Sequence, residues 1–322
     1  MHWMILTAML IAFVLSVVIC PLFIKILRRL QFGQQIREDG PTRHRLKAGT
    51  PTAGGVVFLL AAVAALLILR AWSAAIGLAL FVTLGNALIG WLDDSAKIAR
   101  SRSQGLKARS KLFGQLIVAL AFTAGIYLFG DYSSVVVLPF SGREIDLAYL
   151  YPLFVLVIIS AATNGVNLTD GIDGLATGTV VIALLAFLYI ASTRDLPDMA
   201  LFCGAMIGGC FGFLVYNLHP ARIFMGDAGS LGLGGALAAA AVLTKTELLL
   251  VIIGGVFVLE VLSVILQVIS FQLTRRRIFL MAPLHHHFEL KGWSEWQVVT
   301  GFWGLAFIFA LAGLIEVWQQ IM

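Results

Sequence analysis

Runs of apolar residues long enough to cross a bilayer recur along most of this 322-residue chain. The hydrocarbon core of a membrane is about 30 Å thick, and a helix needs about 20 apolar residues to span it. About ten such runs are present. They lie near residues 3–27, 53–70, 74–92, 112–130, 148–166, 175–192, 199–216, 230–243, 248–271 and 298–318. The sequence therefore predicts an all-α polytopic membrane protein with about ten transmembrane helices in one domain, 1–322.

The composition supports this fold class and excludes others. Apolar residues make up 60% of the chain and charged residues 12%, whereas soluble domains are about 45–50% apolar and about 25% charged. An ordinary soluble enzyme, a disordered protein and a nucleic-acid-binding module are excluded, and we expect no nucleic-acid partner. The first apolar run begins without a basic leader, which predicts a spanning helix rather than a signal peptide. Cys20, Cys203 and Cys210 all lie in apolar runs, which predicts a packing role.

The basic residues predict the topology. Eighteen of the 22 Lys and Arg residues fall on one side of the predicted helices, and only Arg70, Arg143, Arg194 and Lys245 fall on the other. The positive-inside rule then places both termini outside and five loops in the cytoplasm. The cytoplasmic loops also hold most of the Asp, Asn and His residues that could do chemistry. Among the outer loops, 131–147 is the longest, and its Val135–Val137 run predicts a small hairpin.

The first cytoplasmic loop, residues 33–55, is rich in glycine and proline and carries Lys47, Thr50 and Thr52. Exposed backbone amides beside a lysine suit an anionic ligand. A polybasic segment that touches anionic lipid is an equally good interpretation of this loop alone. No GxxxxGK[ST] motif is present, which excludes P-loop phosphate chemistry.

Asp93 and Asp94 end the third predicted span. Adjacent carboxylates at a membrane surface are costly unless they face a divalent cation or a basic substrate. Helix capping is a poor alternative, because Asp caps N-termini and the helix dipole disfavours it at a C-terminal end. Since neighbouring side chains on a helix point about 100° apart, we expect only one of the two to address the reacting centre.

Two further motifs add polar groups on the same side. Asn164, Asn167, Asp170 and Asp173 recur every three residues, which predicts a shared ridge on a helical turn, with glycines that let a ligand approach the backbone. Asp227 directly precedes the glycine-rich eighth predicted span. Carboxylates that converge from different helices are the usual way to hold Mg²⁺.

The last cytoplasmic loop contains His285, His286 and His287. Successive imidazoles diverge, so hydrogen bonding to a phosphate or a sugar suits them better than joint ligation of one zinc ion. The Arg275–Arg277 run upstream is interpreted as a positive-inside anchor. Glu260 is a carboxylate in the middle of a span that could pair with a helix or line a groove, and the sequence assigns it no role.

These motifs together resemble the phospho-N-acetylmuramoyl-pentapeptide transferase family, within the polyprenyl-phosphate N-acetylhexosamine-1-phosphate transferase superfamily. The resemblance covers essentially the whole chain. It rests on the motifs at 33–41, 49–52, 93–94, 167–171, 224–227 and 283–289, of which the histidine motif separates the muramoyl enzymes from their GlcNAc-1-phosphate relatives. Ala53 and Ile172 depart from the expected Met and Leu.

The resemblance implies a ten-helix enzyme, commonly a homodimer, in the bacterial plasma membrane with a cytoplasmic active site. Such an enzyme transfers phospho-MurNAc-pentapeptide from UDP-MurNAc-pentapeptide to undecaprenyl phosphate, giving lipid I and UMP, the first membrane step of peptidoglycan synthesis. By the motif match, Asp227 would hold Mg²⁺ together with Asp93, and Asp93 would also serve as general base or nucleophile. Asp94 would support Asp93, and His285 would complete the catalytic set.

The same match implies the substrate contacts. Lys47, Asp173 and Asn217 would bind uracil, with Phe224 stacked on it. The ribose and phosphates would contact Thr52, Asn167, Asp170, Gly171, Ile172 and Gly226. Phosphate or sugar would contact Lys111, His285, His286 and His287.

Two other functions are compatible with parts of this pattern. A GlcNAc-1-phosphate transferase of the same fold differs only in its sugar. A secondary transporter belongs to another class, and it would show internal repeats and acidic residues near the bilayer midplane. This sequence shows no tandem repeat, and its candidate acidic residues, Glu260 apart, cluster at one surface.

Overall fold

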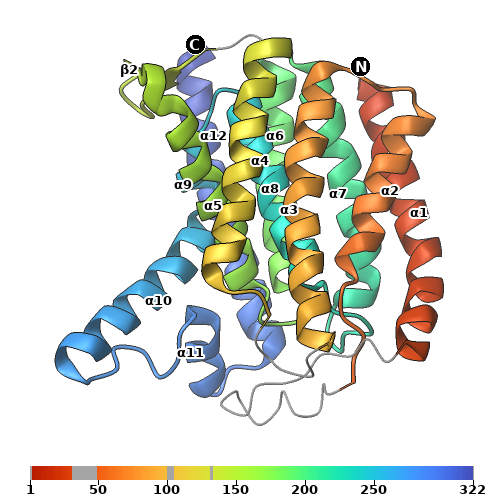
Figure 1. Cartoon of the computed structure of the whole chain (residues 1–322), viewed down its shortest axis with the longest axis vertical. Coiled ribbons are helices and arrows are strands. Elements are labelled where there is room, and N and C mark those ends of the chain that lie inside the picture. The colour runs from red at the N-terminus through yellow and green to blue at the C-terminus, as the bar shows by residue number, and fades with distance from the viewer. Residues whose placement is uncertain (1, 31–48, 100–104, 131–132, 322) are drawn as a thin grey trace.

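The computed structural model describes residues 2–30, 49–99, 105–130 and 133–321, and in these ranges the chain is mainly helical. The long helices run side by side from one end of the molecule to the other, and the start of α1 and the end of α12 lie at the same end (Figure 1). The helices are α1 (His2–Arg29), α2 (Gly55–Ile68), α3 (Ala74–Ala99), α4 (Ala108–Phe129), α5 (Tyr151–Thr169), α6 (Leu175–Thr193), α7 (Pro197–Asn217), α8 (Gly226–Leu243), α9 (Leu249–Ile253), α10 (Gly255–Thr274), α11 (Leu284–Leu290) and α12 (Glu295–Ile321).

Within the described ranges, nine helices are long and apolar enough to cross a membrane, and α2 is a shorter apolar helix of 14 residues. This confirms the prediction of an all-α polytopic membrane protein. The expected hairpin is also confirmed, because β1 (Val135–Val137) pairs antiparallel with β2 (Glu144–Asp146), followed by the 3₁₀ turn η2 (Ala148–Leu150). The assignment of the two ends to the cytoplasm and the exterior stays a prediction.

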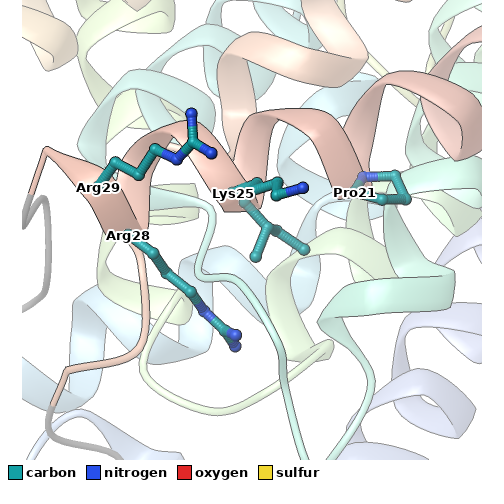
Figure 2. A pocket seen from close by; sticks show the side chains of 5 residues that line it. Pro21, Lys25, Arg28 and Arg29 are labelled. Atoms are coloured by element: carbon teal, nitrogen blue, oxygen red, sulfur yellow. The ribbon is translucent and has the colours of Figure 1, made fainter.

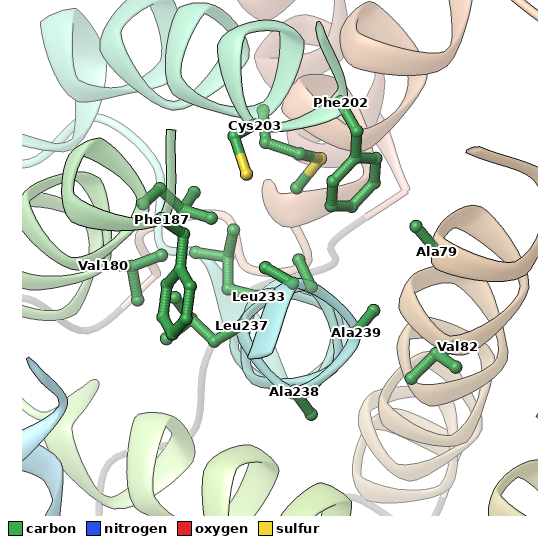
Figure 3. Packing of buried hydrophobic residues seen from close by; sticks show 14 of the residues in the cluster. Ala79, Val82, Val180, Phe187, Phe202, Cys203, Leu233, Leu237, Ala238 and Ala239 are labelled. Carbon is green, nitrogen blue, oxygen red and sulfur yellow. The ribbon is translucent and has the colours of Figure 1, made fainter. Parts of the chain in front are cut away.

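Helix α8 forms the centre of the bundle and packs against α2, α3, α5 and α6. Its sequence is mostly glycine and alanine, and 15 of its 18 residues are buried. Small residues let helices approach closely in a membrane, where dispersion contacts rather than the hydrophobic effect hold them together. Figure 3 shows Leu233 and Leu237 of α8 beside Phe187 of α6, and Ala239 facing α3. Helix α8 therefore holds its neighbours at short distances around the first turn that carries Asp227.

Two predicted spans, 74–92 and 230–243, are shorter than the helices that contain them, and in both cases the residues left out include acidic ones. Helix α3 continues to Ala99, so Asp93 and Asp94 lie within its last two turns. Helix α8 begins at Gly226, so Asp227 lies in its first turn rather than before it. Hydropathy marks where a helix leaves the hydrocarbon, but the backbone hydrogen bonds continue into the polar region beyond it.

The prediction of one continuous span at 248–271 was wrong. The chain forms α9 and then α10, with a break at Gly254, whose dihedral angles (φ −86°, ψ 21°) are not helical. Two consecutive glycines permit this break because their helix propensity is low. After it, α10 leaves the bundle at an angle, and α11 lies between α10 and the adjacent end of the bundle (Figure 1).

Candidate functional site

Three carboxylates from α3 and α8 meet at one end of the bundle. The helices touch where a methyl group on Gly90 would lie 2.0 Å from the carbonyl oxygen of Asp227, so only glycine permits the approach. One turn further along α3, Asp93 and Asp94 face Asp227, and an oxygen from each of the three lies within 4.8 Å of the others. We call these three residues the carboxylate centre.

Two lysines neutralise much of this negative charge. The Nζ of Lys97 lies 2.7 Å from Asp93 Oδ2, 2.9 Å from Asp227 Oδ1 and 3.6 Å from Asp94 Oδ1. The Nζ of Lys111, on α4, lies 2.8 Å from Asp227 Oδ2 and 3.2 Å from Asp93 Oδ1. Three carboxylates and two ammonium groups leave one net negative charge. Lys97 was missed by sequence reasoning, although its position four residues after Asp93 places it on the same helical face.

Both adjacent carboxylates lie close to Asp227, and the expectation that only one of them addresses the reacting centre stays a prediction. Asp94 Oδ2 accepts a hydrogen bond from the Ala228 N–H in the first turn of α8, at 3.1 Å. Asp93 Oδ1 accepts one from the Leu106 N–H at 2.7 Å. Because α3 and α8 are nearly in backbone contact, side chains 100° apart on α3 both fall within reach of α8. Asp93 and Asp94 are buried, whereas the Asp227 side chain is 16% exposed and is the more accessible of the three.

The carboxylate centre is compatible with a divalent metal ion. Its three converging carboxylates supply the hard oxygen ligands that Mg²⁺ prefers. Asp227, the most exposed of them, leaves room for water or a phosphate oxygen on the metal. Because the ammonium groups of Lys97 and Lys111 contact the same oxygens, a cation that binds here must compete with them or displace them.

The loop before α2 is attached to the segment that leads into α8. Phe224 N–H donates to the Pro51 carbonyl (2.8 Å), Gly54 N–H donates to the Phe224 carbonyl (2.9 Å), and Gly55 N–H donates to the Met225 carbonyl (2.9 Å). Gly226 has a φ of +72°, and a methyl group there would lie 2.6 Å from Asp94 Oδ2. The predicted residues Thr52, Phe224 and Gly226 are therefore placed beside the carboxylate centre by backbone hydrogen bonds.

Asn217 and Asp173 organise the segment between α7 and α8. Asn217 donates to the Ile223 carbonyl (3.1 Å) and accepts from the Thr177 hydroxyl (2.9 Å), which fastens this segment to α6. Asp173 Oδ2 accepts from the Ala221 N–H at 3.0 Å and lies 3.0 Å from His219 Nδ1. His219 Nδ1 lies 3.2 Å from Glu295 Oε2 at the start of α12. Sequence reasoning assigned nothing to His219 or Glu295, because only the fold brings them to Asp173.

The expected polar ridge at 164–173 is only half correct. Asn164 and Asn167 lie on α5, but that helix ends at Thr169, and Asp170 and Asp173 belong to the turn before α6. Gly171 and Gly174, the latter with φ +76°, let the chain turn there instead of continuing the helix. Burial raises the pKa of Asp170 well above its usual value, and the nearby carboxylates of Asp227, Asp94 and Asp173 raise it further.

The three histidines on α11 contact different hydrogen-bonding groups, but the expected divergence is only partly correct, because the ring centroids of His285 and His286 lie 4.1 Å apart. His285 is fully buried, its Nδ1 lies 3.0 Å from Glu260 Oε1, and its ring lies against Gly171. His286 Nδ1 lies 2.7 Å from Glu289 Oε2. His287 Nδ1 accepts a hydrogen bond from the Leu280 N–H at 3.1 Å. Of the three, His285 joins the turn that contains Asp170, Gly171 and Ile172.

A separate pocket lies along the last turns of α1 and contains none of the predicted site residues. It is lined by Pro21, Ile24, Lys25, Arg28 and Arg29 (Figure 2). Its basic side chains belong to the group that the positive-inside rule assigns to the cytoplasmic side.

Lys47, predicted to bind the nucleotide, lies outside the described residues.

The bundle of membrane helices and its carboxylate–lysine centre define a polytopic integral-membrane protein equipped for chemistry on an anionic substrate. The family model for glycosyl transferase family 4 matches residues 75–245, which include the whole carboxylate centre. The chain is also 51% identical over 317 residues to the phospho-N-acetylmuramoyl-pentapeptide-transferase of Geobacillus kaustophilus (strain HTA426), covering 97% of this chain and 98% of that protein. It is 49% identical over 319 residues to the protein of the same name from Bacillus subtilis (strain 168), covering 98% of each chain. The chain belongs to glycosyl transferase family 4 and, within it, to the phospho-N-acetylmuramoyl-pentapeptide-transferase family.

Proposed function

We propose that this protein transfers phospho-MurNAc-pentapeptide from UDP-MurNAc-pentapeptide to undecaprenyl phosphate, giving lipid I and UMP. The observation that carries the proposal is the carboxylate centre with its two lysines, in a chain about half identical to transferases of that name along nearly its whole length. The reaction belongs at the cytoplasmic face of the bacterial plasma membrane, because the sugar nucleotide is soluble and the polyprenyl chain is not. We also propose a homodimer.

The chemistry suits this site. Both reactants are anionic at phosphorus, so the attack of one phosphate on the other needs charge neutralisation and in-line positioning more than covalent help. Lys97 and Lys111 supply positive charge at the carboxylates that face the reacting groups. Mg²⁺, held by Asp227 and Asp93, would neutralise the pyrophosphate and orient it.

In one route Asp93 accepts the proton of undecaprenyl phosphate, whose oxygen attacks the sugar-bearing phosphorus of the donor and displaces UMP. In the other route Asp93 attacks that phosphorus and displaces UMP, and undecaprenyl phosphate then displaces Asp93 from the aspartyl-phosphate intermediate. The hydrogen bond that Asp93 accepts from the Leu106 N–H fixes its orientation. Asp94 supports Asp93 by anchoring α3 to the first turn of α8 through the Ala228 N–H.

The nucleotide binds beside the centre. Phe224, half-buried, stacks on uracil, and Asp173 and Lys47 contact the base. Asn217 acts here by holding the segment that carries Phe224. The ribose and phosphates lie along Thr52, Asn167, Asp170, Gly171, Ile172 and Gly226. Lys111, His285, His286 and His287 contact phosphate or sugar.

The decisive experiment compares donors. Purified protein in detergent, supplied with undecaprenyl phosphate and Mg²⁺, is assayed with UDP-MurNAc-pentapeptide and with UDP-GlcNAc by release of UMP and formation of the lipid product. Turnover of the muramoyl donor alone is expected. Preference for UDP-GlcNAc would replace the proposal with the GlcNAc-1-phosphate transferase, and no transfer from either donor would reject both.

The roles of two carboxylates are separated by their response to metal. Asp227→Asn removes a charge that a hard cation prefers, so Mg²⁺ affinity and activity should fall together and extra Mg²⁺ should restore part of the rate. Asp93→Asn should abolish turnover at any Mg²⁺ concentration while the UDP-sugar still binds. Equal rescue of both variants by Mg²⁺ would show that this division of roles is wrong.

A further inference from the structure

Glu260 is a fully buried carboxylate on α10, and all its hydrogen bonds in the described part of the chain go to one segment. Its Oε2 accepts from the Leu284 N–H at 2.6 Å, and its Oε1 accepts from the His285 N–H at 3.3 Å. The same Oε1 lies 3.0 Å from His285 Nδ1. A carboxylate in a membrane helix is expensive, and it is retained where it has a function or a charged partner.

These contacts determine how the His285 ring is presented. A carboxylate oxygen only accepts hydrogen bonds, so the Nδ1 of His285 carries the proton toward Glu260. The opposite nitrogen, Nε2, is buried without a hydrogen-bond partner among the described residues. It lies against the turn after α5, since a methyl group on Gly171 would come within 2.2 Å of it. His285 therefore directs an unused ring nitrogen at Gly171.

We propose that Glu260 is a positioning residue for the transfer reaction, which fixes the tautomer and orientation of His285 so that Nε2 hydrogen-bonds to the sugar nucleotide at Gly171. The inference rests on the proposed function. A carboxylate that holds an imidazole by Nδ1 so that Nε2 can act is a recurrent device in enzymes and metal sites. It also gives a reason for the close contact at Gly171, where any side chain would cover Nε2.

The competing explanation is that Glu260 only fastens α11 to α10. Glu260→Gln tests this, because its amide oxygen can still accept from the Leu284 N–H while its amide nitrogen accepts neither from the His285 ring nor from the His285 backbone N–H, whose bond to Oε1 is the longest of the three at 3.3 Å. Carboxylates that orient a metal-ligating histidine are worth about 10–100-fold in metal affinity or activity, and the same range is taken for this pair. We expect kcat to fall by about that factor, with a smaller change in KM for the UDP-sugar and little change in the melting temperature. Glu260→Asp keeps the charge and should retain more activity than Glu260→Gln.

The test is a double-mutant cycle with the full-length protein in detergent. Wild type, Glu260→Gln, His285→Ala and the double variant are compared by initial rates with UDP-MurNAc-pentapeptide and by melting temperature. If Glu260 acts through His285, adding Glu260→Gln to His285→Ala causes no further loss of rate. The matched control is Glu316→Gln. Glu316 is a buried carboxylate on α12, 21 residues beyond Glu295, which lies beside Asp173, and hence about 30 Å along the helix from that end. The change in rate caused by Glu316→Gln should be the same in the wild-type and the His285→Ala backgrounds.

Three results would overturn the inference. One is a loss of rate from Glu260→Gln of the same size in both backgrounds, and another is full activity in Glu260→Gln. The third is a fall in rate that is accompanied by a clear fall in melting temperature, with no more activity in Glu260→Asp than in Glu260→Gln. That result would assign Glu260 a structural role only. A wild-type protein that turns over no muramoyl donor removes the proposed function and this inference with it, whereas additive effects in an active enzyme remove the inference alone.

Discussion

Replacing Lys97 with methionine should increase the affinity of the carboxylate centre for a divalent cation. The Lys97 Nζ lies 2.7–3.6 Å from oxygens of all three carboxylates, so it occupies the position from which a cation would contact them. Methionine is similar in length and flexibility but uncharged. The substitution changes the net charge of the three carboxylates and two lysines from −1 to −2.

The magnitude follows from Coulomb's law. A unit charge and a divalent cation about 4 Å apart repel each other by about 2 kcal/mol at the dielectric constant of water and by about 8 kcal/mol at an effective value of 20. Lys97 is 29% exposed and can move aside, so the lower figure is appropriate. About 2 kcal/mol corresponds to an approximately 30-fold increase in affinity.

Binding is measured without turnover, by titrating detergent-solubilised protein with Mn²⁺ as a substitute for Mg²⁺ and following free Mn²⁺ by electron paramagnetic resonance. Lys97→Arg keeps the charge and should bind Mn²⁺ as the wild type does. Lys107→Met removes an exposed basic residue one turn before Lys111, and screening should limit its effect to about twofold. Equal Mn²⁺ affinity in Lys97→Met and Lys97→Arg would refute the competition between Lys97 and the metal.

Three further substitutions test the site. Gly90→Ala should abolish Mn²⁺ binding and turnover in a protein that still inserts and folds, because the added methyl group would force the Asp227 backbone away from α3. Normal activity in this variant would show that the contact between Gly90 and Asp227 does not position the carboxylates. Phe224→Ala should weaken UMP binding by about 1–3 kcal/mol through lost stacking, and unchanged affinity by calorimetry would instead favour a packing role. Asp170→Asn should raise the melting temperature at neutral pH, because a carboxyl whose pKa is raised by folding destabilises the fold increasingly as pH rises from the unfolded pKa through the folded one. The gain should disappear in acid, where both states are protonated, and a gain that persists there would contradict this cause.

The membrane fold could be predicted from the sequence because each spanning helix depends on a local property. Twenty apolar residues satisfy their own backbone hydrogen bonds as a helix and match the bilayer thickness wherever they occur. The predicted helix ends near Asp93 and Asp227 were wrong for a related reason, since hydropathy marks the edge of the hydrocarbon and not the end of the helix. The break at Gly254 was not predicted because a glycine pair permits a bend without requiring one.

The sequence by itself determined the class of the protein, the apolar helices of the described ranges to within one short helix, and the acidic and histidine motifs available for chemistry. Only the tertiary structure decided which of those groups meet. Asp93 and Asp94 both reach Asp227 because Gly90 lets two helices touch. Lys97 and Lys111 come from different helices and contact opposite oxygens of the Asp93 and Asp227 carboxylates. Glu260 meets His285 because α10 leaves the bundle after Gly254 and α11 lies between α10 and the end of the bundle. The physical reason is that residue types and local periodicity are encoded along the chain, whereas distances of 3 Å between side chains from separate helices depend on how the whole bundle packs.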